Sequence, residues 1–485
     1  MKIVVVGGGT AGLISALILK QTYPFFKIDV IRSEKIGTIG VGEGTTEHWQ
    51  DFMNFVGITN GDIVKHCDAT YKSGIMFQNW SKHDYLHSVE SHFTDKYLDI
   101  NFIYAYLISK NANPKDLVVP ITWNSKVSLI DTLQKNIDNA STAQYHFNTH
   151  KLNDFLCDLC ENRNIKIIDD EIVDVIISNT GEIEKIVGSK DYEYDFYIDS
   201  TGFKKLLIGK LGAEWQSYKQ HLKMNSAIVF PTENTDYPMW TGARAMNAGW
   251  MFTIPVWERK GNGYIYCDEY INDNEAKKEV EELLGHKIKV AKKIKFDPGS
   301  LDKFWIKNCC AIGLSANFVE PLEATSIGTS IQQSFLLASK ICNYVQEDIN
   351  LYNKQVESIM ENIKDFIFLH YMCDRTDTEF WQDVSRLDPP ESLQKKLSMW
   401  QHRLPVDDDL IEHTDKILFK SANYLIVLYA LNKIDISTIK SQFDHLPYNV
   451  QQYAENKIYE INQMLQTANL VDHKTVLSLV RECYK

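Results

Sequence analysis

The sequence predicts an α/β protein with a Rossmann-like, dinucleotide-binding body and a largely helical C-terminal part. Three observations support this fold class. The chain opens on an apolar run that leads directly into glycines and then into a helical pattern. Two later apolar runs, in residues 195–202 and 309–315, also end in glycine-bearing turns, as strands of one nucleotide-binding sheet do. From about residue 341 the apolar spacing becomes helical and few strand signals remain.

The first twenty residues, MKIVVVGGGTAGLISALILK, carry the strongest local signal. Residues 3–6 are an apolar run typical of a buried parallel strand, a helical pattern follows the glycines, and KIDVIRS indicates a second strand. Gly7, Gly9 and Gly12 match G-x-G-x-x-G: the first permits the turn, the second admits a pyrophosphate, and the third allows close packing. We expect the phosphates at the N-terminus of that helix, where free N–H groups and the helix dipole attract anions.

An arginine ends the second predicted strand, where an acidic residue usually binds the ribose. Arg32 lies twenty residues past Gly12. An arginine at this point can bind the 2′-phosphate of NADP, or it can stack on an adenine. Glu34 is close enough in the chain to compete for the ribose, so these alternatives stay open.

The composition is that of a folded soluble protein. Hydrophobic residues make up 44% and charged residues 24% of the 485 positions. The formal charge of −13 argues against a nucleic acid or an anionic membrane as a partner. No apolar run reaches ~18 residues, so no membrane span is predicted. Nine cysteines, an odd number, and no visible signal peptide favour a reducing cytoplasm, and we interpret the lone C-x-x-C of Cys157 and Cys160 as helix packing rather than as a metal site.

Two short stretches suggest surfaces that face a ligand. Residues 40–46, GVGEGTT, combine a high glycine density with Glu43, which indicates a loop passing close to a ligand, although a plain loop has the same composition. Residues 249–255, GWMFTIP, alternate as a short strand in which Trp250 and Phe252 share one face. That face belongs either to an ordinary core or to an aromatic wall of a binding site.

A lysine lies within a third stretch of strand-like alternation. Residues 69–80, ATYKSGIMFQNW, place Lys72 on the same face as Gly74 and Met76. Such a lysine lies either at a sheet edge with its amine in water or inside a pocket. In a pocket, burial would lower the pKa of the amine and allow Lys72 to act as a nucleophile or a proton donor.

A helix with hydroxyl residues at its start is predicted within residues 318–341, FVEPLEATSIGTSIQQSFLLASKI. Thr325 and Ser326 lie at the helix start and Glu323 lies just before it. This pattern indicates either an ordinary capped helix or an anion site in which the backbone N–H groups of Thr325 and Ser326 bind a small anion.

Six stretches together resemble a known family, the flavin-dependent halogenases of the tryptophan-halogenase type. That family has an N-terminal G-x-G-x-x-G, a G-V-G-E strap loop, a lysine in an [FY]-K-x-x-I-x-F-x-N-W strand, a W-x-W-x-I-P motif and an E-P-L-E-S-T-G turn. Each motif alone is weak, but here they occur in the order of the family and cover most of the chain. The matching stretches are GGGTAG at 7–12, GVGEGT at 40–45, YKSGIMFQNW at 71–80, GWMFTIP at 249–255, GLSANFVEPLEATS at 313–326, and HY with RTDTEFW in 370–381.

The resemblance implies an FAD-binding body of the flavin-monooxygenase (GR2) type, with the helical C-terminal part covering the substrate. It implies FAD, used as FADH2, together with O2 and a halide ion. Reduced flavin and oxygen would convert the halide into hypohalous acid, which would cross the protein to a separate substrate pocket. The residues expected at the cofactor are Gly7, Gly9, Thr10, Ala11, Gly12, Arg32, Ser33, Gly40, Val41, Gly42, Glu43, Gly313, Leu314 and Ile327.

The same resemblance implies roles for residues at the reaction site. Lys72 would hold the hypohalous acid, by a hydrogen bond or as a haloamine, and direct the electrophile. Glu323 would polarise that oxidant or take the ring proton. The halide would rest on the backbone N–H groups of Thr325 and Ser326 beside the flavin.

The sequence departs from the family pattern at two of these motifs. Phe252 replaces the second tryptophan of W-x-W, and because phenylalanine is still apolar we expect Trp250 and Phe252 to form a wall between flavin and substrate. Ser326 replaces the glycine of E-S-T-G, so the preference among chloride, bromide and iodide stays open.

The resemblance also suggests how the chain is divided and which partner it needs. Residues 1–340 would form the FAD-binding body, interrupted by substrate-facing segments at about 80–150 and 215–300, and residues 341–485 a mainly helical module packed on it. No second glycine fingerprint offers a nicotinamide site, so we expect a separate flavin reductase to supply FADH2. Members of the family are often homodimers.

The substrate-facing residues differ from those of tryptophan-specific members. Phe419 replaces a clamping tryptophan, and Asp407 and Asp408 fall where those members have a tyrosine pair. Unless this acidic run is a solvated loop, carboxylates there would repel the carboxylate of free tryptophan. We therefore expect a small electron-rich aromatic substrate, an indole or a phenol, with His87 also lining its pocket.

Two other functions share parts of this pattern. A flavin monooxygenase that hydroxylates an aromatic would have the same fold, but Lys72 and the aromatic wall argue against it. A non-catalytic sensor that reads NADP through Arg32 would make the pairing of Lys72 with Glu323 a coincidence. Given the resemblance, we favour a contact of Arg32 with the adenine or ribose of FAD.

Overall fold

A computed structural model describes residues 1–485 except for 38–41, 89–92, 94, 119–123, 129–143 and 484–485. The predicted N-terminal βαβ unit is confirmed: β1 (Lys2–Val6) leads into α1 (Thr10–Thr22) and then into β2 (Lys27–Arg32). Strands β1 and β2 pair in parallel, with Ile3 opposite Ile28. The apolar residues of β1 are fully buried, as in a strand covered on both faces.

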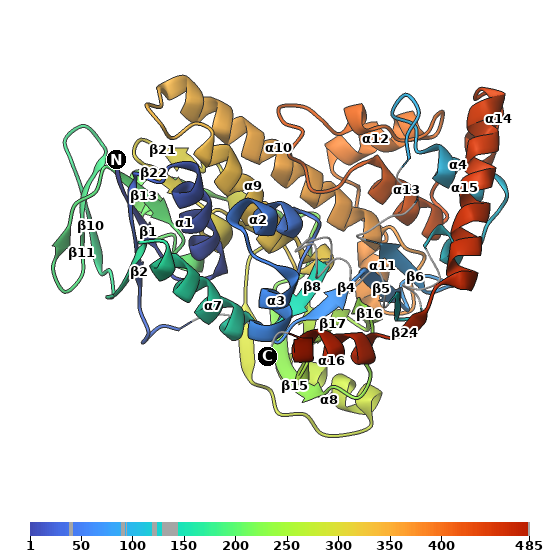
Figure 1. Ribbon diagram of the computed structural model, residues 1–485, viewed down its shortest axis with the longest axis horizontal. Helices are drawn as coiled ribbons and strands as arrows, with labels where there is room; N and C mark the ends of the chain where they lie inside the picture. The colour runs from blue at the N-terminus through green and yellow to red at the C-terminus, as the bar shows by residue number, and fades with distance from the viewer. Residues whose placement is uncertain (38–41, 89–92, 94, 119–123, 129–143, 484–485) are drawn as a thin grey trace.

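The βαβ unit belongs to a six-stranded sheet in the order β21-β22-β13-β1-β2-β9. The runs expected to return to this sheet do so, because β13 pairs in parallel with β1, and β22 pairs in parallel with β13. Only β21 runs antiparallel to its neighbour. Figure 1 shows α1 and α7 beside this sheet, with α9 behind them. The added strands are β9 (Lys166–Asp169), β13 (Phe196–Asp199), β21 (Trp305–Ile306) and β22 (Cys309–Ala311).

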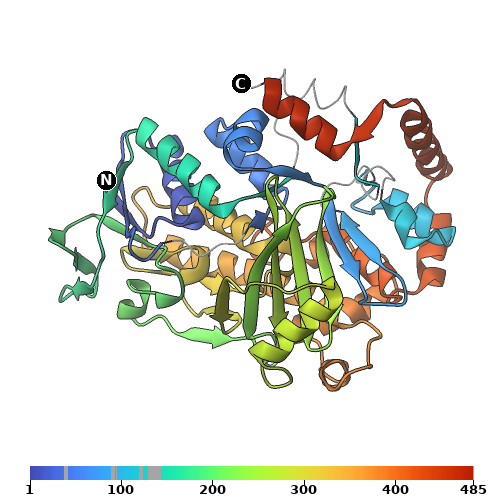
Figure 2. The same ribbon diagram turned by 90° about the horizontal axis from the view of Figure 1, so that it is seen from below.

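A second sheet of seven strands follows the order β19-β15-β18-β17-β16-β5-β6 and is antiparallel except where β5 meets β16. Figure 2 shows its green and yellow strands fanned out beside the blue pair from the N-terminal quarter of the chain. Its strands are β5 (Gly74–Gln78), β6 (Tyr85–Ser88), β15 (Ser226–Glu233), β16 (Trp240–Met246), β17 (Gly249–Pro255), β18 (Arg259–Tyr266) and β19 (Lys292–Lys295).

The single strand expected over residues 69–80 is wrong. The chain forms β4 (Thr70–Lys72) in a small sheet with β3 (Glu43–Gly44) and β8 (Gln144–Phe147), and then β5 in the seven-stranded sheet. The break falls at Ser73, whose backbone N–H donates to Met239 O at 2.6 Å instead of to a strand of the small sheet. Lys72 and Gly74 therefore lie in different sheets, although two-residue alternation runs through both.

The C-terminal part is largely helical, as predicted. One strand interrupts it: β24 (Leu470–Asp472) pairs with β7 (Lys126–Ser128) and carries the chain back toward α3 (Figure 1). The helices of this part are α10 (Gln346–Tyr371), α11 (Glu379–Val384), α12 (Glu391–Trp400), α13 (Ser421–Ala430), α14 (Ile436–Asp444), α15 (Tyr448–Thr467) and α16 (His473–Cys483).

The remaining elements cover the two large sheets and connect them. The helices are α2 (His48–Val56), α3 (Asn60–His66), α4 (Phe102–Ser109), α7 (Thr149–Asn162), α8 (Asp273–Leu284) and α9 (Thr325–Ala338). The strands are β10 (Asp174–Ile177), β11 (Ile183–Val187), β12 (Asp191–Tyr192), β14 (Trp215–Ser217), β20 (Gly299–Leu301) and β23 (Asn317–Phe318).

One hydrophobic core runs from the nucleotide-binding sheet into the C-terminal helices. Helices α1 and α9 pack closely in it, and the hydroxyls of Ser15 and Ser334 meet at 2.8 Å between them. Small residues at this contact let the two helices approach, so the N-termini of both are held by one rigid body. Across the described ranges, no helix is both long enough and apolar enough to span a membrane.

Candidate active site

The glycine fingerprint has the geometry that a bound pyrophosphate needs. Gly7 has φ +119°, and a Cβ there would lie 2.0 Å from Ser200 O. A Cβ at Gly12 would lie 2.1 Å from Gly7 O. At Gly9, by contrast, a Cβ would meet nothing within 4 Å. The first and third glycines are therefore required by packing, whereas the second leaves open space at the N-terminus of α1.

The glycine-bearing turn at Gly313 lies against the N-terminus of α1. Gly313 has φ +73°, and a Cβ there would approach Ala11 Cβ to 2.5 Å. Its N–H donates to Gln333 Oε1 in α9 at 3.2 Å. Leu314 follows half-buried in the same turn, and Ile327 is buried in α9. Segments some three hundred residues apart thus meet where the cofactor residues were expected.

Arg32 ends β2, as expected, and its guanidinium contacts two groups of the protein. It donates to Cys157 Sγ at 3.1 Å and lies 3.3 Å from Glu34 Oε1. Cys157 and Cys160 both lie buried and unbridged in α7, in agreement with a packing role. Ser33 is half-buried beside Arg32.

Lys72 is buried, so the alternative of an edge lysine with its amine in water is wrong. The side chain is 1% exposed, and its Nζ donates to Thr45 O at 2.6 Å. Burial lowers the pKa of Lys72 to about 8, against the attraction of Glu323 and Glu47. A large fraction of this amine is therefore neutral near pH 8.

The strap segment lies directly over this lysine. A Cβ at Gly44 would approach Lys72 Nζ to 3.3 Å, so the glycine leaves room for the amine. Gly42 has φ +124° and lies against Ile254, and burial raises the pKa of Glu43 to about 7. Gly40 and Val41, the other strap residues expected at the cofactor, lie outside the described residues.

Glu323 lies in a turn with φ +70° and is held by two histidines. His87 Nδ1 is 2.7 Å from its Oε2, and His370 Nε2 is 3.1 Å from its Oε1. All three side chains are at most 1% exposed. Burial would raise the pKa of Glu323, but the contacts with His87 and then His370 outweigh burial and hold that pKa below its usual range.

His370 is a site residue that was not predicted from the sequence. His370 belongs to the HY pair that was matched to the family, but no role followed from that match. It lies in the last turn of α10, 47 positions after Glu323, and the packing of α10 against α9 brings the two together. A histidine within a matched motif was the available signal.

The start of α9 is not an ordinary capped helix. Thr325 is the first helical residue rather than the cap, and the cap position is Ala324 with φ 56° and no side-chain hydrogen bond. Thr325 is 1% exposed, and its hydroxyl has no partner among the described residues. No acidic side chain occupies the first turn, which includes Ser326. The N-terminus of a 14-residue helix is thus left available to an anion.

Trp250 and Phe252 lie on one face of β17, as predicted, with ring centroids 6.2 Å apart. Both are buried, and a Cβ at Gly263 would come within 2.3 Å of the Phe252 ring. Trp250 Nε1 donates to Glu320 Oε1 at 3.2 Å, and the Tyr371 hydroxyl donates to the same oxygen. Burial raises the pKa of Glu320 to about 8, although these two bonds lower it in part.

The residues expected to face the substrate show one clear correction. Phe419 stacks on Phe366 at 4.0 Å, and Phe366 lies 5.3 Å from the ring of His87, so Phe419 and His87 belong to one aromatic cluster. Asp407 is not a free carboxylate. It accepts a hydrogen bond from Lys96 and, at 2.9 Å, one from the backbone N–H of Ser421. Asp407 is therefore not expected to repel a substrate carboxylate as predicted, because the Lys96 ammonium lies beside it.

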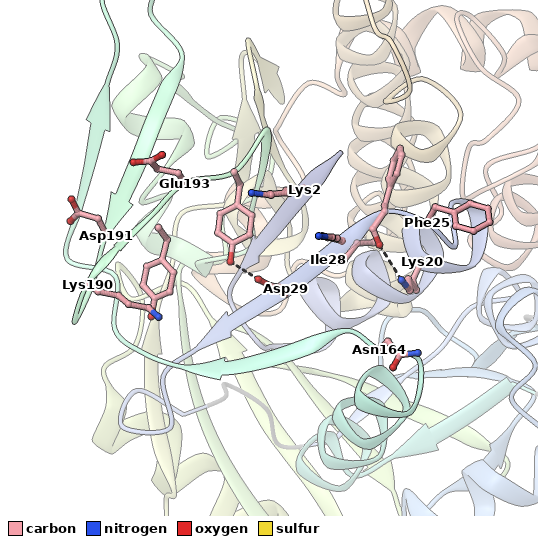
Figure 3. A pocket seen from close by; sticks show the side chains of 13 residues that line it. Lys2, Lys20, Phe25, Ile28, Asp29, Asn164, Lys190, Asp191 and Glu193 are labelled. Carbon is pink, nitrogen blue, oxygen red and sulfur yellow. Dashed lines mark hydrogen bonds between the residues drawn. The ribbon is translucent and has the colours of Figure 1, made fainter.

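A surface cavity of about 620 Å³ lies elsewhere and holds none of the expected site residues (Figure 3). It opens at Lys2 and Lys27, the first residues of β1 and β2, whereas ligands of open α/β sheets bind at the carboxyl ends of the strands. Tyr194 and Asp29 both line this cavity, and the Tyr194 hydroxyl donates to Asp29 at 2.6 Å. Among the residues that the structure describes, no cluster of metal-ligating side chains occurs either.

Comparison with known proteins agrees with this geometry. The family described as tryptophan halogenase matches residues 2–444. The 7-chloro-L-tryptophan 6-halogenase KtzR of Kutzneria sp. is 31% identical over 443 residues, which cover 83% of this chain and 85% of KtzR.

Solved structures show the same likeness. The tryptophan halogenase from Shewanella frigidimarina is 26% identical with a TM-score of 0.89, and the match covers 99% of this chain and 98% of that one. BrvH, a flavin-dependent halogenase from Brevundimonas sp. BAL3, is 26% identical with a TM-score of 0.84 over 99% of both chains. The chain therefore belongs to the tryptophan halogenase family and is a flavin-dependent halogenase.

Proposed function

We propose that this enzyme halogenates an electron-rich aromatic ring, indole-like or phenol-like, with hypohalous acid that Lys72 holds and directs. The observation that carries the proposal is the buried Lys72 amine, whose pKa of about 8 leaves part of it neutral. A neutral amine can form a haloamine, and an ammonium can donate a hydrogen bond to the oxidant, so both forms are accessible near neutral pH.

The described residues fit an FAD molecule. Open space above Gly9, the N-terminus of α1, and the approach of Gly313 to Ala11 form a cradle for a pyrophosphate. When bound in its reduced form, FAD would supply the electrons with which O2 converts halide and a proton into hypohalous acid and water. We place the adenine or ribose near Arg32 and Ser33, at the carboxyl end of β2.

A halide fits the N-terminus of α9. The N–H groups of Thr325 and Ser326 lack a side-chain cap, and the buried hydroxyl of Thr325 has no partner among the described residues. An anion would satisfy these donors and the helix dipole together. These groups at the start of α9 do not favour one halide radius over another, so chloride, bromide and iodide should all be assayed.

Lys72 and Glu323 have different roles at the substrate. Lys72 presents the halogen to the ring, while Glu323, ionised between two histidines, attracts the cationic ring intermediate and accepts its proton. The reaction replaces a ring hydrogen with halogen and releases water, so no further oxidant is consumed. The wall of Trp250 and Phe252 would keep the ring away from the flavin.

The chemistry of the reaction and the names of the relatives limit the range of candidate substrates. KtzR is named for a chlorinated tryptophan, and the Shewanella protein for tryptophan. Because Asp407 is paired with Lys96, its charge no longer argues against a substrate carboxylate. Tryptophan therefore belongs in the substrate panel beside simple indoles and phenols. We infer that a separate flavin reductase supplies the reduced FAD.

The test is mass spectrometry of turnover mixtures that contain FAD, a generic flavin reductase, NADH, O2 and one halide at a time. Lys72→Met keeps the length and packing of the side chain but removes the amine, and Lys65→Met on an exposed lysine of α3 is the matched control. We expect the halogenated product to fall at least ~100-fold with Lys72→Met only. Hydroxylated product, or halogenation that survives Lys72→Met, would instead indicate a monooxygenase or freely diffusing hypohalous acid.

A further inference from the structure

The two oxygens of Glu323 each face one imidazole nitrogen, and the two histidines come from different parts of the fold. His87 lies in β6 and His370 lies in the last turn of α10. An ionised carboxylate can only accept hydrogen bonds, so the His87 nitrogen that is hydrogen-bonded to it must carry a hydrogen. Whether the other nitrogen of each ring also carries a hydrogen decides whether that ring is neutral or charged.

Asn423 determines the state of His87. The backbone N–H of Lys420 donates to Asn423 Oδ1 at 2.7 Å, which assigns the oxygen of the amide to the N-terminus of α13. The amide nitrogen, which can only donate, therefore faces His87 Nε2 at 3.0 Å. Since Nε2 must accept this bond, it carries no hydrogen. His87 is neutral, with its one hydrogen on the Nδ1 that meets Glu323, so it lowers the pKa of Glu323 through this hydrogen bond rather than through a charge.

Tyr85 leaves the state of His370 open. Its hydroxyl lies 2.8 Å from His370 Nδ1 and can either donate to a neutral ring or accept from a charged one. Phe77 stacks on the rings of both His370 and Tyr85, at 4.3 Å and 4.7 Å, and holds them nearly parallel. His370 can therefore gain a proton without losing a hydrogen bond, whereas His87 cannot.

We propose that Asn423 is a positioning residue of the halogenation site, which holds His87 neutral so that the Glu323 carboxylate keeps its full negative charge. A charged His87 would neutralise Glu323 and weaken the attraction of that carboxylate for a cationic ring intermediate and for Lys72. The ionisable and hydrogen-bonding groups around Glu323 are then Lys72 from β4, His87 and Tyr85 from β6, and His370 from α10, with Asn423 from α13 behind His87. This inference rests on the proposed role of Glu323.

Asn423→Asp tests the proposal with little change of shape. The aspartate keeps an oxygen for the Lys420 N–H but loses the donor toward His87, so His87 takes up a second proton and becomes charged. Asn272→Asp is the matched control, since Asn272 also accepts backbone N–H groups at a helix start, that of α8, far from the site.

Two readouts separate this inference from the proposed function. The first is ¹⁵N NMR of the imidazoles, with His87 assigned through His87→Gln, and it does not require turnover. We expect a neutral His87 with hydrogen on Nδ1 in the native protein at pH 7 and a charged His87 in Asn423→Asp. A charged His87, or one with hydrogen on Nε2, in the native protein would overturn the proposal.

The second readout is the pH dependence of halogenation. For Asn423→Asp we expect kcat to fall ~10-fold or more at pH 7 with KM changed less than about threefold, and the pH profile to differ from the native one. Asn272→Asp should keep the native profile. A profile for Asn423→Asp that matches the native one while His87 is shown to be charged would refute the role of Asn423 and leave that of Glu323 intact.

Discussion

Glu320 and Glu323 lie three residues apart in one turn, yet their surroundings drive their acidities in opposite directions. Glu320 is buried against Trp250 and Tyr371 without a cation, and burial raises its pKa to about 8. Glu323 is equally buried, but its contacts with two imidazole nitrogens hold its pKa below the usual range. At neutral pH the first is mainly a carboxylic acid and the second a carboxylate, which is how one turn can provide two different chemical groups.

Replacement of each carboxyl by an amide should reduce activity at Glu323 much more than at Glu320. Glu320→Gln replaces a neutral acid by a neutral amide that can still accept from Trp250 and Tyr371, so we expect activity within about threefold of native. Glu323→Gln removes the charge and places an N–H₂ group against a histidine N–H, so we expect a loss of ~100-fold or more in kcat. Turnover measured by mass spectrometry at pH 7.5 checks both variants. Equal losses would show that the charge of Glu323 has no special role.

At the scale of elements, the C-terminal helix α16 supports the strand that carries Lys72. His473, the first residue of α16, accepts the backbone N–H of Tyr71 at its Nε2 (3.1 Å) and donates from Nδ1 to Tyr237 O (2.8 Å). Arg481 at the other end of α16 donates to Val64 O in α3. Because Tyr71 precedes Lys72 in β4, the docking of α16 helps to hold the backbone at the lysine.

This docking should weaken in acid. The hydrogen bond that Nε2 accepts from Tyr71 requires a neutral ring, and burial lowers the pKa of His473 to about 4. The unfolded segment has the ordinary value near 6.5, so between these values it binds more protons than the docked one, and stability rises with pH there. The contribution is complete above pH 6.5 and is lost as the pH falls toward 4. From pH 7.5 to pH 5 we expect the docked helix to lose about 2 kcal/mol.

Hydrogen exchange of the α16 peptide, corrected for the intrinsic rate at each pH, measures this loss as a fall in the free energy of local opening. His473→Leu should remove the pH dependence between pH 5 and 7.5, and His286→Leu, at an exposed histidine, should retain it. An opening free energy of native α16 that does not change with pH would show that His473 does not control its docking.

At the scale of the whole molecule, one long helix links the nucleotide-binding sheet to the reaction site. Helix α10 has 26 residues, a length of about 39 Å. Near its start Asn353 accepts the N–H groups of Phe304 and Trp305 at the edge of the nucleotide-binding sheet, and at its end His370 reaches Glu323. In Figure 1, α10 runs from beside β21 and β22 toward the C-terminal helices, so it links the two regions.

The whole chain offers a single glycine fingerprint, which should make the enzyme independent of nicotinamide once reduced FAD is present. We expect FAD that was reduced photochemically without oxygen, and then mixed with oxygenated halide and substrate, to yield up to one halogenated product per enzyme. Oxidised FAD without a reductant should yield none. A requirement for NADPH in addition to reduced FAD would reveal a nicotinamide site in the chain and exclude the need for a separate reductase. Mass spectrometry after rapid mixing makes the comparison.

Local patterns predicted most of the fold. The βαβ unit, the return of two distant runs to one sheet, the aromatic face of β17 and the helical C-terminal part are confirmed, because each depends on spacing within a few residues. The break at Ser73 was missed because two-residue alternation continues across two strands that pair with different partners. The missing cap at Ala324 was missed because a threonine at a helix start resembles a cap in sequence.

The sequence by itself determined which residue types are present at the site: the glycines of the cradle, Lys72, Glu323 and the aromatic strand. Only the tertiary structure decided their state. It buried Lys72, paired Asp407 with Lys96 across 311 positions, and brought His87 to Glu323 across 236. The physical reason is that backbone geometry follows from neighbours in the chain, whereas the charge of a buried group depends on partners that any distant segment can provide.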